Sequence, residues 1–142
     1  MGDIPDDVGL WLHKYADSWF IGGSRGALGK ADADLDIVVL CNSGGVWAPP
    51  GFEPSGNKYA CEEAVMPNLS YSREGVDLII CNDATVFRSW WKAHQIVSAL
   101  QLTSRDDRVR VHHIVLERQG TYLKLKQGEM KVSRVEDICL DI

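Results

Sequence analysis

The stretch WFIGGSRGALGKADADLDIVVL, residues 19–40, decides the fold. A hydrophobic run ends in two glycines and a serine, a short polar segment follows, and two aspartates stand at the head of a second hydrophobic run. This order is typical of a strand, a short helix and a buried strand that follow one another in an α/β domain. The predicted elements are a strand over 18–22, a weak helix over 24–31 and a strand over 35–41.

The remaining patterns alternate between helix and strand. Helical spacing of apolar residues, together with candidate N-cap residues, predicts helices over 5–17, 83–100 and 104–119. A continuous apolar run predicts a strand over 76–82, and the alternation in YLKLK before a turn at Gln127-Gly128 favours a terminal hairpin.

One long segment interrupts this alternation. Residues 42–75 hold four of the five prolines of the chain, and structureless segments of this length inside a compact domain tend to be functional or disordered. We expect an irregular insertion with one helical turn at 60–65. A chain of 142 residues predicts a single domain over 1–142. Its expected class is α/β (α+β), with helices packed on a small mixed β-sheet.

Charge is spread unevenly along the chain. Residues 1–82 carry 5 Lys or Arg against 12 Asp or Glu, and residues 83–142 carry 10 against 8. Proteins that bind long nucleic acids usually show a strongly basic face, so a long nucleic acid is not an expected partner. The acidic half suits either divalent cations or a solvated surface. No apolar run could span a membrane and the acidic N-terminus has no signal-peptide pattern, so we expect a cytoplasmic location without a membrane partner.

The four cysteines, Cys41, Cys61, Cys81 and Cys139, are scattered along the sequence. Structural zinc sites usually use closely spaced ligand pairs, and the chain contains no CxxC pair. Buried reduced thiols are therefore expected, above all at Cys41 and Cys81, which end apolar runs.

Two aspartates, Asp34 and Asp36, stand one residue apart at the start of a predicted strand. Residues two apart in a strand point to the same face, so these carboxylates project together while Leu35 and Ile37 face the core. Adjacent carboxylates repel unless a cation lies between them, and oxygen ligands favour Mg²⁺ or Mn²⁺. Asp77 holds the equivalent place in the next apolar strand and completes the site if the two strands are neighbours. A pair of solvated strand-end carboxylates is the simpler alternative.

The turn before these aspartates has the features of an anion site. Gly22 and Gly23 let the backbone approach a ligand closely, and the helix that follows offers free N–H groups to a phosphate from Ser24 onward. Arg25 and Lys30 are candidates for further phosphate contacts, with a solvated surface charge as the alternative at each position. Carboxylates beside an anion-binding turn predict a site for a metal-bound triphosphate.

Gly23-Ser24, the Asp34-x-Asp36 pair after a short spacer, and Asp77 on a later strand together resemble the motif of minimal nucleotidyltransferases of the DNA polymerase β superfamily. The stretch DADLD, residues 32–36, is similar to the DSDLD form of the small members. FRSWWKAHQIVSAL and RVRVHHIV resemble segments of small nucleotidyltransferases often encoded by phages. The resemblance covers roughly residues 10–100.

This resemblance implies a polymerase β-type nucleotidyltransferase fold with two Mg²⁺ ions among Asp34, Asp36 and Asp77. It implies an enzyme that transfers a nucleoside monophosphate from an NTP such as ATP to an acceptor hydroxyl, releases pyrophosphate, and uses Asp77 to help remove the acceptor proton. The acceptor would be a protein side chain, an RNA end or a small molecule. The chain departs from the family in residues 42–75 and in lacking a separate helical substrate domain, so the substrate site does not carry over.

Two other readings remain open. A catalytically silent module of the same fold would bind a nucleotide or a protein partner, as an antitoxin-like or inhibitory protein does, and an unrelated α/β protein would leave the three aspartates far apart. Trp90 and Trp91 are expected as one core and one partly exposed residue, with base stacking as the alternative. Lys92 and His94 share their helix and are weaker candidates for the site.

Overall fold

The computed structural model describes residues 4–30, 33–41, 48–55 and 69–118, together with the backbone of 64–65, 123–126 and 129–132. In these ranges the helices are α1 (Asp6–Tyr15), α2 (Gly23–Leu28), α3 (Ala84–Leu100) and α4 (Arg105–Arg118). The strands are β1 (Ser18–Gly22), β2 (Leu35–Leu40), β3 (Glu53–Pro54), β4 (Ala64–Val65), β5 (Leu69–Arg73), β6 (Val76–Cys81), β7 (Leu123–Lys126) and β8 (Glu129–Val132). The chain is therefore mixed α/β, as predicted. None of the described helices is both long and apolar enough to cross a lipid bilayer.

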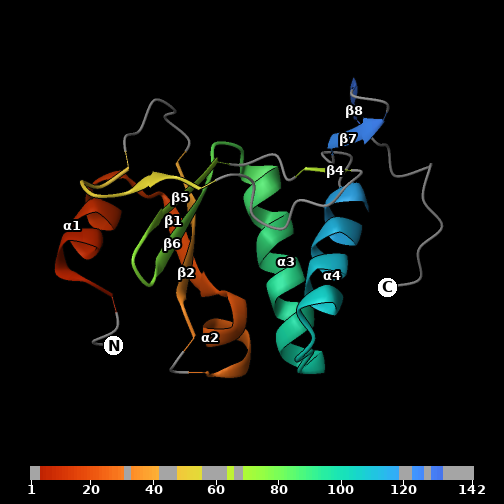
Figure 1. Ribbon diagram of the computed structural model, residues 1–142, viewed down its shortest axis with the longest axis horizontal. Helices are drawn as coiled ribbons and strands as arrows, with labels where there is room; N and C mark the ends of the chain where they lie inside the picture. The colour runs from red at the N-terminus through yellow and green to blue at the C-terminus, as the bar shows by residue number, and fades with distance from the viewer. Residues whose placement is uncertain are drawn as a thin grey trace.

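A central sheet has the strand order β1-β2-β6-β5-β3 (Figure 1). β2 and β6 run parallel, with Leu35 opposite Val76 and Leu40 opposite Cys81, whereas the other strand pairs of this sheet are antiparallel. The parallel pair consists almost wholly of buried residues, as expected for strands that are covered on both faces. In a second sheet of order β4-β7-β8, β7 and β8 form the predicted terminal hairpin.

Helices cover both faces of the central sheet, with α1 on one side and α3 on the other (Figure 1). The buried cluster on the α1 side contains Leu35, Ile37, Val39, Leu78 and Ile80 with Val8, Trp11 and Leu12. The buried cluster on the α3 side contains Val38, Leu40, Ile79 and Cys81 with Phe20, Val86, Phe87 and Trp90. Successive residues of β2 and β6 therefore point to opposite layers, as the strand period of two requires.

The helices α3 and α4 pack side by side (Figure 1). Asp83 is the N-cap of α3, because its carboxylate accepts hydrogen bonds from backbone N–H groups of the first turn. Where the two helices meet, the rings of Trp90 and His112 lie 4.7 Å apart between centroids. Trp90 is 2% exposed and Trp91 is 42% exposed, which confirms the expected division between core and surface.

The short helix α2 is held between β1 and α3 by two contacts. A Cβ atom at Gly26 would lie 2.0 Å from the carbonyl oxygen of Ile21, so only a glycine allows this approach. In addition, the side-chain amide of Gln101 donates to the carbonyl oxygen of Ala27 at 3.1 Å. These contacts fix α2 beside the start of β2.

The segment 42–75 differs from the prediction. Residues 69–73 form β5, which pairs with β6 through a turn at Glu74-Gly75, so the expectation of irregular structure is wrong there. The helical turn expected at 60–65 is wrong at residues 64–65, which belong to β4, and 60–63 lie outside the described residues. Strand pairing with β6 overrides the polar composition of β5, which gave no apolar signal.

The cysteine prediction is confirmed where the structure tests it. Cys41 and Cys81 are free thiols at the ends of β2 and β6, and both are fully buried. Burial raises the pKa of each thiol above its ordinary value, so neither is poised to react. Cys61 and Cys139 lie outside the described residues.

Candidate functional site

Two of the predicted site residues occupy partner positions on the parallel strands. Asp36 of β2 lies opposite Asp77 of β6, on strands that run about 4.8 Å apart. Both side chains belong to the α3 side of the sheet, because Val38 and Ile79, two residues further along, lie in the α3 cluster. Asp36 is 8% exposed. Carboxylates this close with little solvent around them repel each other, a setting that favours a bound cation.

The third aspartate, Asp34, precedes β2 and is exposed, and it lines the same cavity as Asp36. Leu35 lies in the buried cluster on the α1 side, which confirms that the aspartates and their apolar neighbours point to opposite faces. Arg25 of α2 holds the loop in front of Asp34: its Nε and Nη2 donate to the carbonyl oxygen of Ala33 at 3.0 and 2.8 Å. The structure thus gives Arg25 a role in positioning Asp34.

The Gly22-Gly23-Ser24 turn joins β1 to α2 directly beside Asp36. Gly22 pairs with Asp36 in the sheet and is the N-cap of α2. Gly23 has a φ of +61°, and a Cβ atom there would lie 2.1 Å from Oδ2 of Asp36. The Asp36 carboxylate therefore occupies the space that any other side chain at position 23 would need. Ser24, the next residue, lines the cavity.

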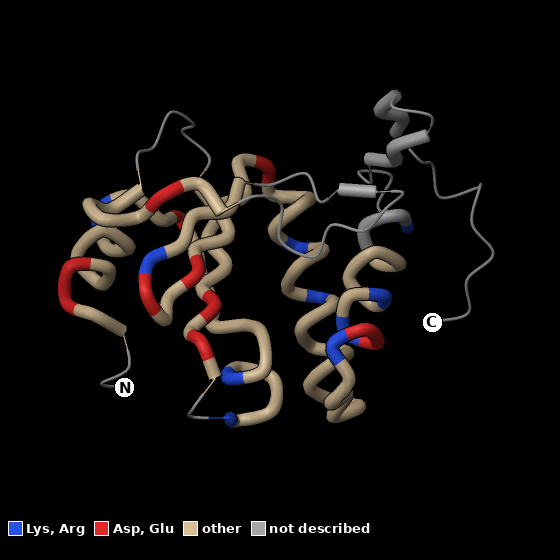
Figure 2. Tube along the Cα trace, viewed as in Figure 1, with Lys and Arg blue, Asp and Glu red and all other residues tan. Residues whose placement is uncertain are grey.

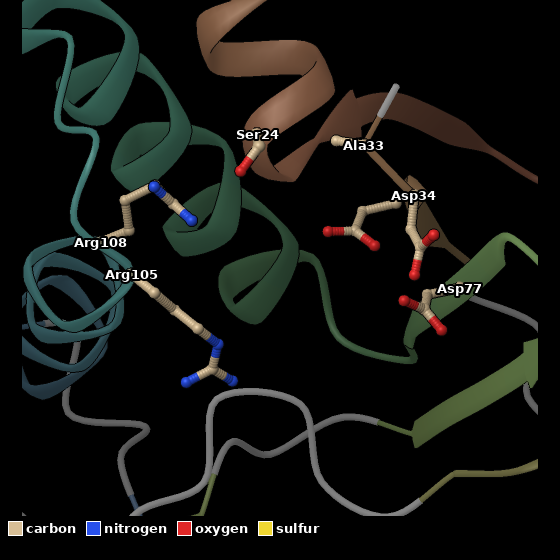
Figure 3. Close-up of a pocket in the computed structure, with 7 residues that line it drawn as sticks. Ser24, Ala33, Asp34, Asp77, Arg105 and Arg108 are labelled. Atoms are coloured by element: carbon tan, nitrogen blue, oxygen red, sulfur yellow. The ribbon is translucent and has the colours of Figure 1, made fainter. Parts of the chain in front are cut away.

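The three aspartates line one cavity of about 180 Å³. Ser24 and Ala33 form part of its wall beside α2, and Arg105 and Arg108 of α4 form the wall opposite the sheet. Figure 3 shows Asp34 and Asp77 on one side of the cavity and the two guanidinium groups on the other. Neither arginine was a predicted site residue, because the charged start of α4, RDDRVR, is typical of a solvent-exposed helix.

Arg108 is anchored at the turn between α3 and α4. Its Nη1 donates to the carbonyl oxygens of Thr103 at 2.7 Å and Leu102 at 3.3 Å. Its Nε is buried and has no hydrogen-bond partner among the described residues. Burial lowers the pKa of His112 to about 4, so its neutral ring donates from Nδ1 to the carbonyl oxygen of Arg108 at 2.9 Å. Side chain and backbone of Arg108 are thus both fixed.

Asp77 is oriented by the neighbouring strand β5. Ser72 is its direct partner in the antiparallel register, and the Ser72 hydroxyl donates to Oδ1 of Asp77 at 2.5 Å. This bond restrains the carboxylate and depends on a strand that the sequence did not predict.

The other candidate residues lie outside the cavity wall. Arg25 and Lys30 do not line the cavity, and Lys30 is exposed. The ring of His94 packs against Phe20 at 5.0 Å between centroids, and burial lowers its pKa. Lys92 is exposed. Neither Lys92 nor His94 belongs to the cavity wall.

The carboxylates suit a divalent cation that keeps part of its water shell. Within the described ranges, no group of three or more His, Cys, Asp or Glu side chains has an arrangement that could hold a metal ion. Mg²⁺ is usually bound by one or two carboxylates together with water and substrate phosphate oxygens. Asp36 and Asp77 supply that minimum, with Asp34 beside them. Their all-oxygen donor set fits Mg²⁺ or Mn²⁺ better than zinc.

Comparisons of the chain with protein-family models, with curated proteins and with solved structures find no match. The likeness to nucleotidyltransferases therefore depends on the motif residues and their arrangement in space. Of these, Ser24, Asp34, Asp36 and Asp77 share one cavity wall.

Proposed function

We propose that the chain is a metal-dependent nucleotidyltransferase, which transfers a nucleoside monophosphate from an NTP to an acceptor hydroxyl and releases pyrophosphate. The observation that carries the proposal is the convergence of Asp34, Asp36 and Asp77 on one cavity beside Ser24. These residues and Gly23 make up the motif that resembles the DNA polymerase β superfamily. We infer a polymerase β-type fold on the same ground, and the mixed sheet is compatible with it.

In this proposal Asp34, Asp36 and Asp77 hold Mg²⁺ or Mn²⁺ at the start of β2 and β6. When bound, the ions neutralise phosphate oxygens and favour deprotonation of the attacking hydroxyl. Ser24 and the backbone N–H groups that follow Gly23 are the expected contacts of the terminal phosphates.

The acceptor oxygen forms a bond to the α-phosphorus while the bond from that phosphorus to the bridging β-phosphate oxygen breaks, and pyrophosphate leaves with the electron pair. Asp77, restrained by Ser72, is the group we assign to take the acceptor proton. The acceptor class is a protein side chain, an RNA end or a small molecule.

Transfer is tested by incubating the purified chain with each α-phosphate-labelled NTP and Mg²⁺, with and without a cell extract as a source of acceptors. Asp36→Asn and Asp77→Asn keep the side-chain size and remove the charge, so label transfer should fall by at least about 100-fold in each. Asp6→Asn is the matched control, because Asp6 is an exposed carboxylate on α1, across the sheet from the cavity. It should transfer label as the wild type does.

Three results are distinguishable. Label that disappears in both cavity variants and persists in Asp6→Asn supports the proposal and identifies the acceptor class. Label that persists in Asp36→Asn and Asp77→Asn contradicts the assigned site. NTP binding without transfer to any acceptor would favour the catalytically silent binding module instead.

A further inference from the structure

The walls of the cavity carry opposite charges. Asp34, Asp36 and Asp77 lie on the sheet side, and Arg105 and Arg108 lie on the α4 side (Figure 3). Figure 2 shows acidic positions along the central strands, and both basic and acidic positions in the first part of α4. The carboxylates attract a cation, and the guanidinium groups attract an anion. The two walls together suit a ligand that carries both charges, namely an anion with a bound metal ion.

Arg108 is already oriented for such a ligand. Its Nη1 is occupied by the carbonyl oxygens at the α3–α4 turn, so the guanidinium plane is fixed before any ligand arrives. Its buried Nε has no hydrogen-bond partner within the described part of the chain, and a buried N–H without an acceptor costs free energy. A planar guanidinium is well suited to phosphate oxygens.

The size of the cavity limits what it can enclose. Its volume of about 180 Å³ is below the roughly 300–1,000 Å³ typical of pockets that enclose a whole drug-sized ligand. The space therefore suits a phosphate chain and its ions, with the remainder of a nucleotide outside this cavity.

We propose that Arg105 and Arg108 form an anion-binding wall for the polyphosphate of a metal-bound nucleoside triphosphate, opposite the carboxylates that hold the metal. The assignment of a nucleoside to this ligand depends on the proposed function, whereas the assignment of a polyphosphate depends on the cavity itself.

The test measures binding of inorganic tripolyphosphate to the full chain by isothermal titration calorimetry, with Mg²⁺ and about 0.15 M salt to screen distant charges. Arg105→Gln and Arg108→Gln should each weaken binding by at least about tenfold, since a charge-assisted hydrogen bond is lost. Arg110→Gln removes the same charge from an exposed position of α4 that does not line the cavity. It should change binding by less than about twofold.

The Arg108→Gln variant loses the Arg108 contacts at the α3–α4 turn. If this loss prevents folding, the Arg105→Gln variant still tests the inference, because Arg105 is exposed. Undetectable tripolyphosphate binding by the wild type, or equal binding by wild type and Arg105→Gln, would overturn the inference. Tripolyphosphate binding that depends on the arginines, in a chain that transfers no label, would uphold the anion wall while the proposed function fails. Label transfer with an unchanged KM for NTP in both arginine variants would overturn the wall and leave the proposed function standing.

Discussion

Replacing Gly23 by alanine would place a methyl group where the Asp36 carboxylate lies. The new Cβ would stand 2.1 Å from Oδ2 of Asp36, whereas ordinary contact begins at 3.4 Å, so the carboxylate must move by roughly 1.3 Å, the difference between these distances. Asp36 is 8% exposed and has little room to move. Gly29 offers a matched control, because its φ of +70° is close to the +61° of Gly23 and a Cβ there would meet no atom within 4 Å.

The expected losses of unfolding free energy distinguish backbone strain from the collision with the Asp36 carboxylate. An alanine in the left-handed conformation costs about 1 kcal/mol of unfolding free energy, which is the loss expected for Gly29→Ala. Overpacking a buried site costs about 1–3 kcal/mol more, so Gly23→Ala should lose about 2–4 kcal/mol. In an Asp36→Ala background the colliding carboxylate is gone, and Gly23→Ala should then cost no more than Gly29→Ala.

Urea unfolding followed by circular dichroism measures these free energies, and an unchanged m-value checks that the transition stays two-state. The cycle of Gly23→Ala and Asp36→Ala should show a coupling free energy of about 1–3 kcal/mol. Equal losses for the two glycine variants, with no coupling between positions 23 and 36, would refute the placement of the Asp36 carboxylate against Gly23.

Two further predictions concern groups around the cavity. The pKa of His112 is about 4 in the folded chain against its ordinary 6.5, so the unfolded state binds the proton first as the pH falls. The free energy of unfolding should drop by on the order of 3 kcal/mol between pH 6.5 and 4 relative to His112→Gln, and parallel urea-unfolding profiles for the two proteins would contradict this. Arg25→Lys and Arg25→Gln should both weaken Mg²⁺ binding about tenfold in calorimetry, because only a guanidinium makes the two-nitrogen contact with Ala33. Full recovery with lysine would instead indicate a charge role, such as the phosphate contact predicted from the sequence.

The part of the site that lies on β2 and β6 could be predicted because its signal is local. Asp36 and Asp77 are each the second residue of a strand, after a single apolar residue. The two strands pair in parallel with their first residues aligned, and this register makes the two aspartates partners. The alternation of side chains then places Asp34 on the same side as Asp36. What the sequence left open was whether the two strands are neighbours, and the central sheet provides that pairing.

β5 and its hydroxyl contact to Asp77 gave a weaker signal. The strand LSYSR is largely polar and only Ser70 is buried in it, so neither apolar content nor a clear alternation marks it. One cue was available: Glu74-Gly75 forms a two-residue connection to β6 with Gly75 at a φ of +75°, which is a hairpin signature. The proline-rich residues before this turn instead favoured the prediction of an irregular segment.

The arginine wall could not be predicted, because it depends on packing between elements. Arg105 and Arg108 reach the cavity only because α4 lies along α3, where His112 meets Trp90. His112 and His113 are both buried, although adjacent histidines in a charged segment carry no apolar signal of a buried face. Long-range contacts of this kind are not encoded in any short stretch of sequence.

Several features of the cavity lower stability when each is taken alone. Asp36 is a buried carboxylate directly opposite another one, and like charges on paired strand positions are destabilising. Gly23 and Gly26 weaken a helix that has six residues, since a helical glycine costs about 0.5–1 kcal/mol relative to alanine. Yet a Cβ atom at either position would collide with Asp36 or with Ile21. These departures from local rules lie together around one small cavity and do not affect the two apolar clusters. A polar ligand site requires such departures, even in a fold that is otherwise consistent with its sequence.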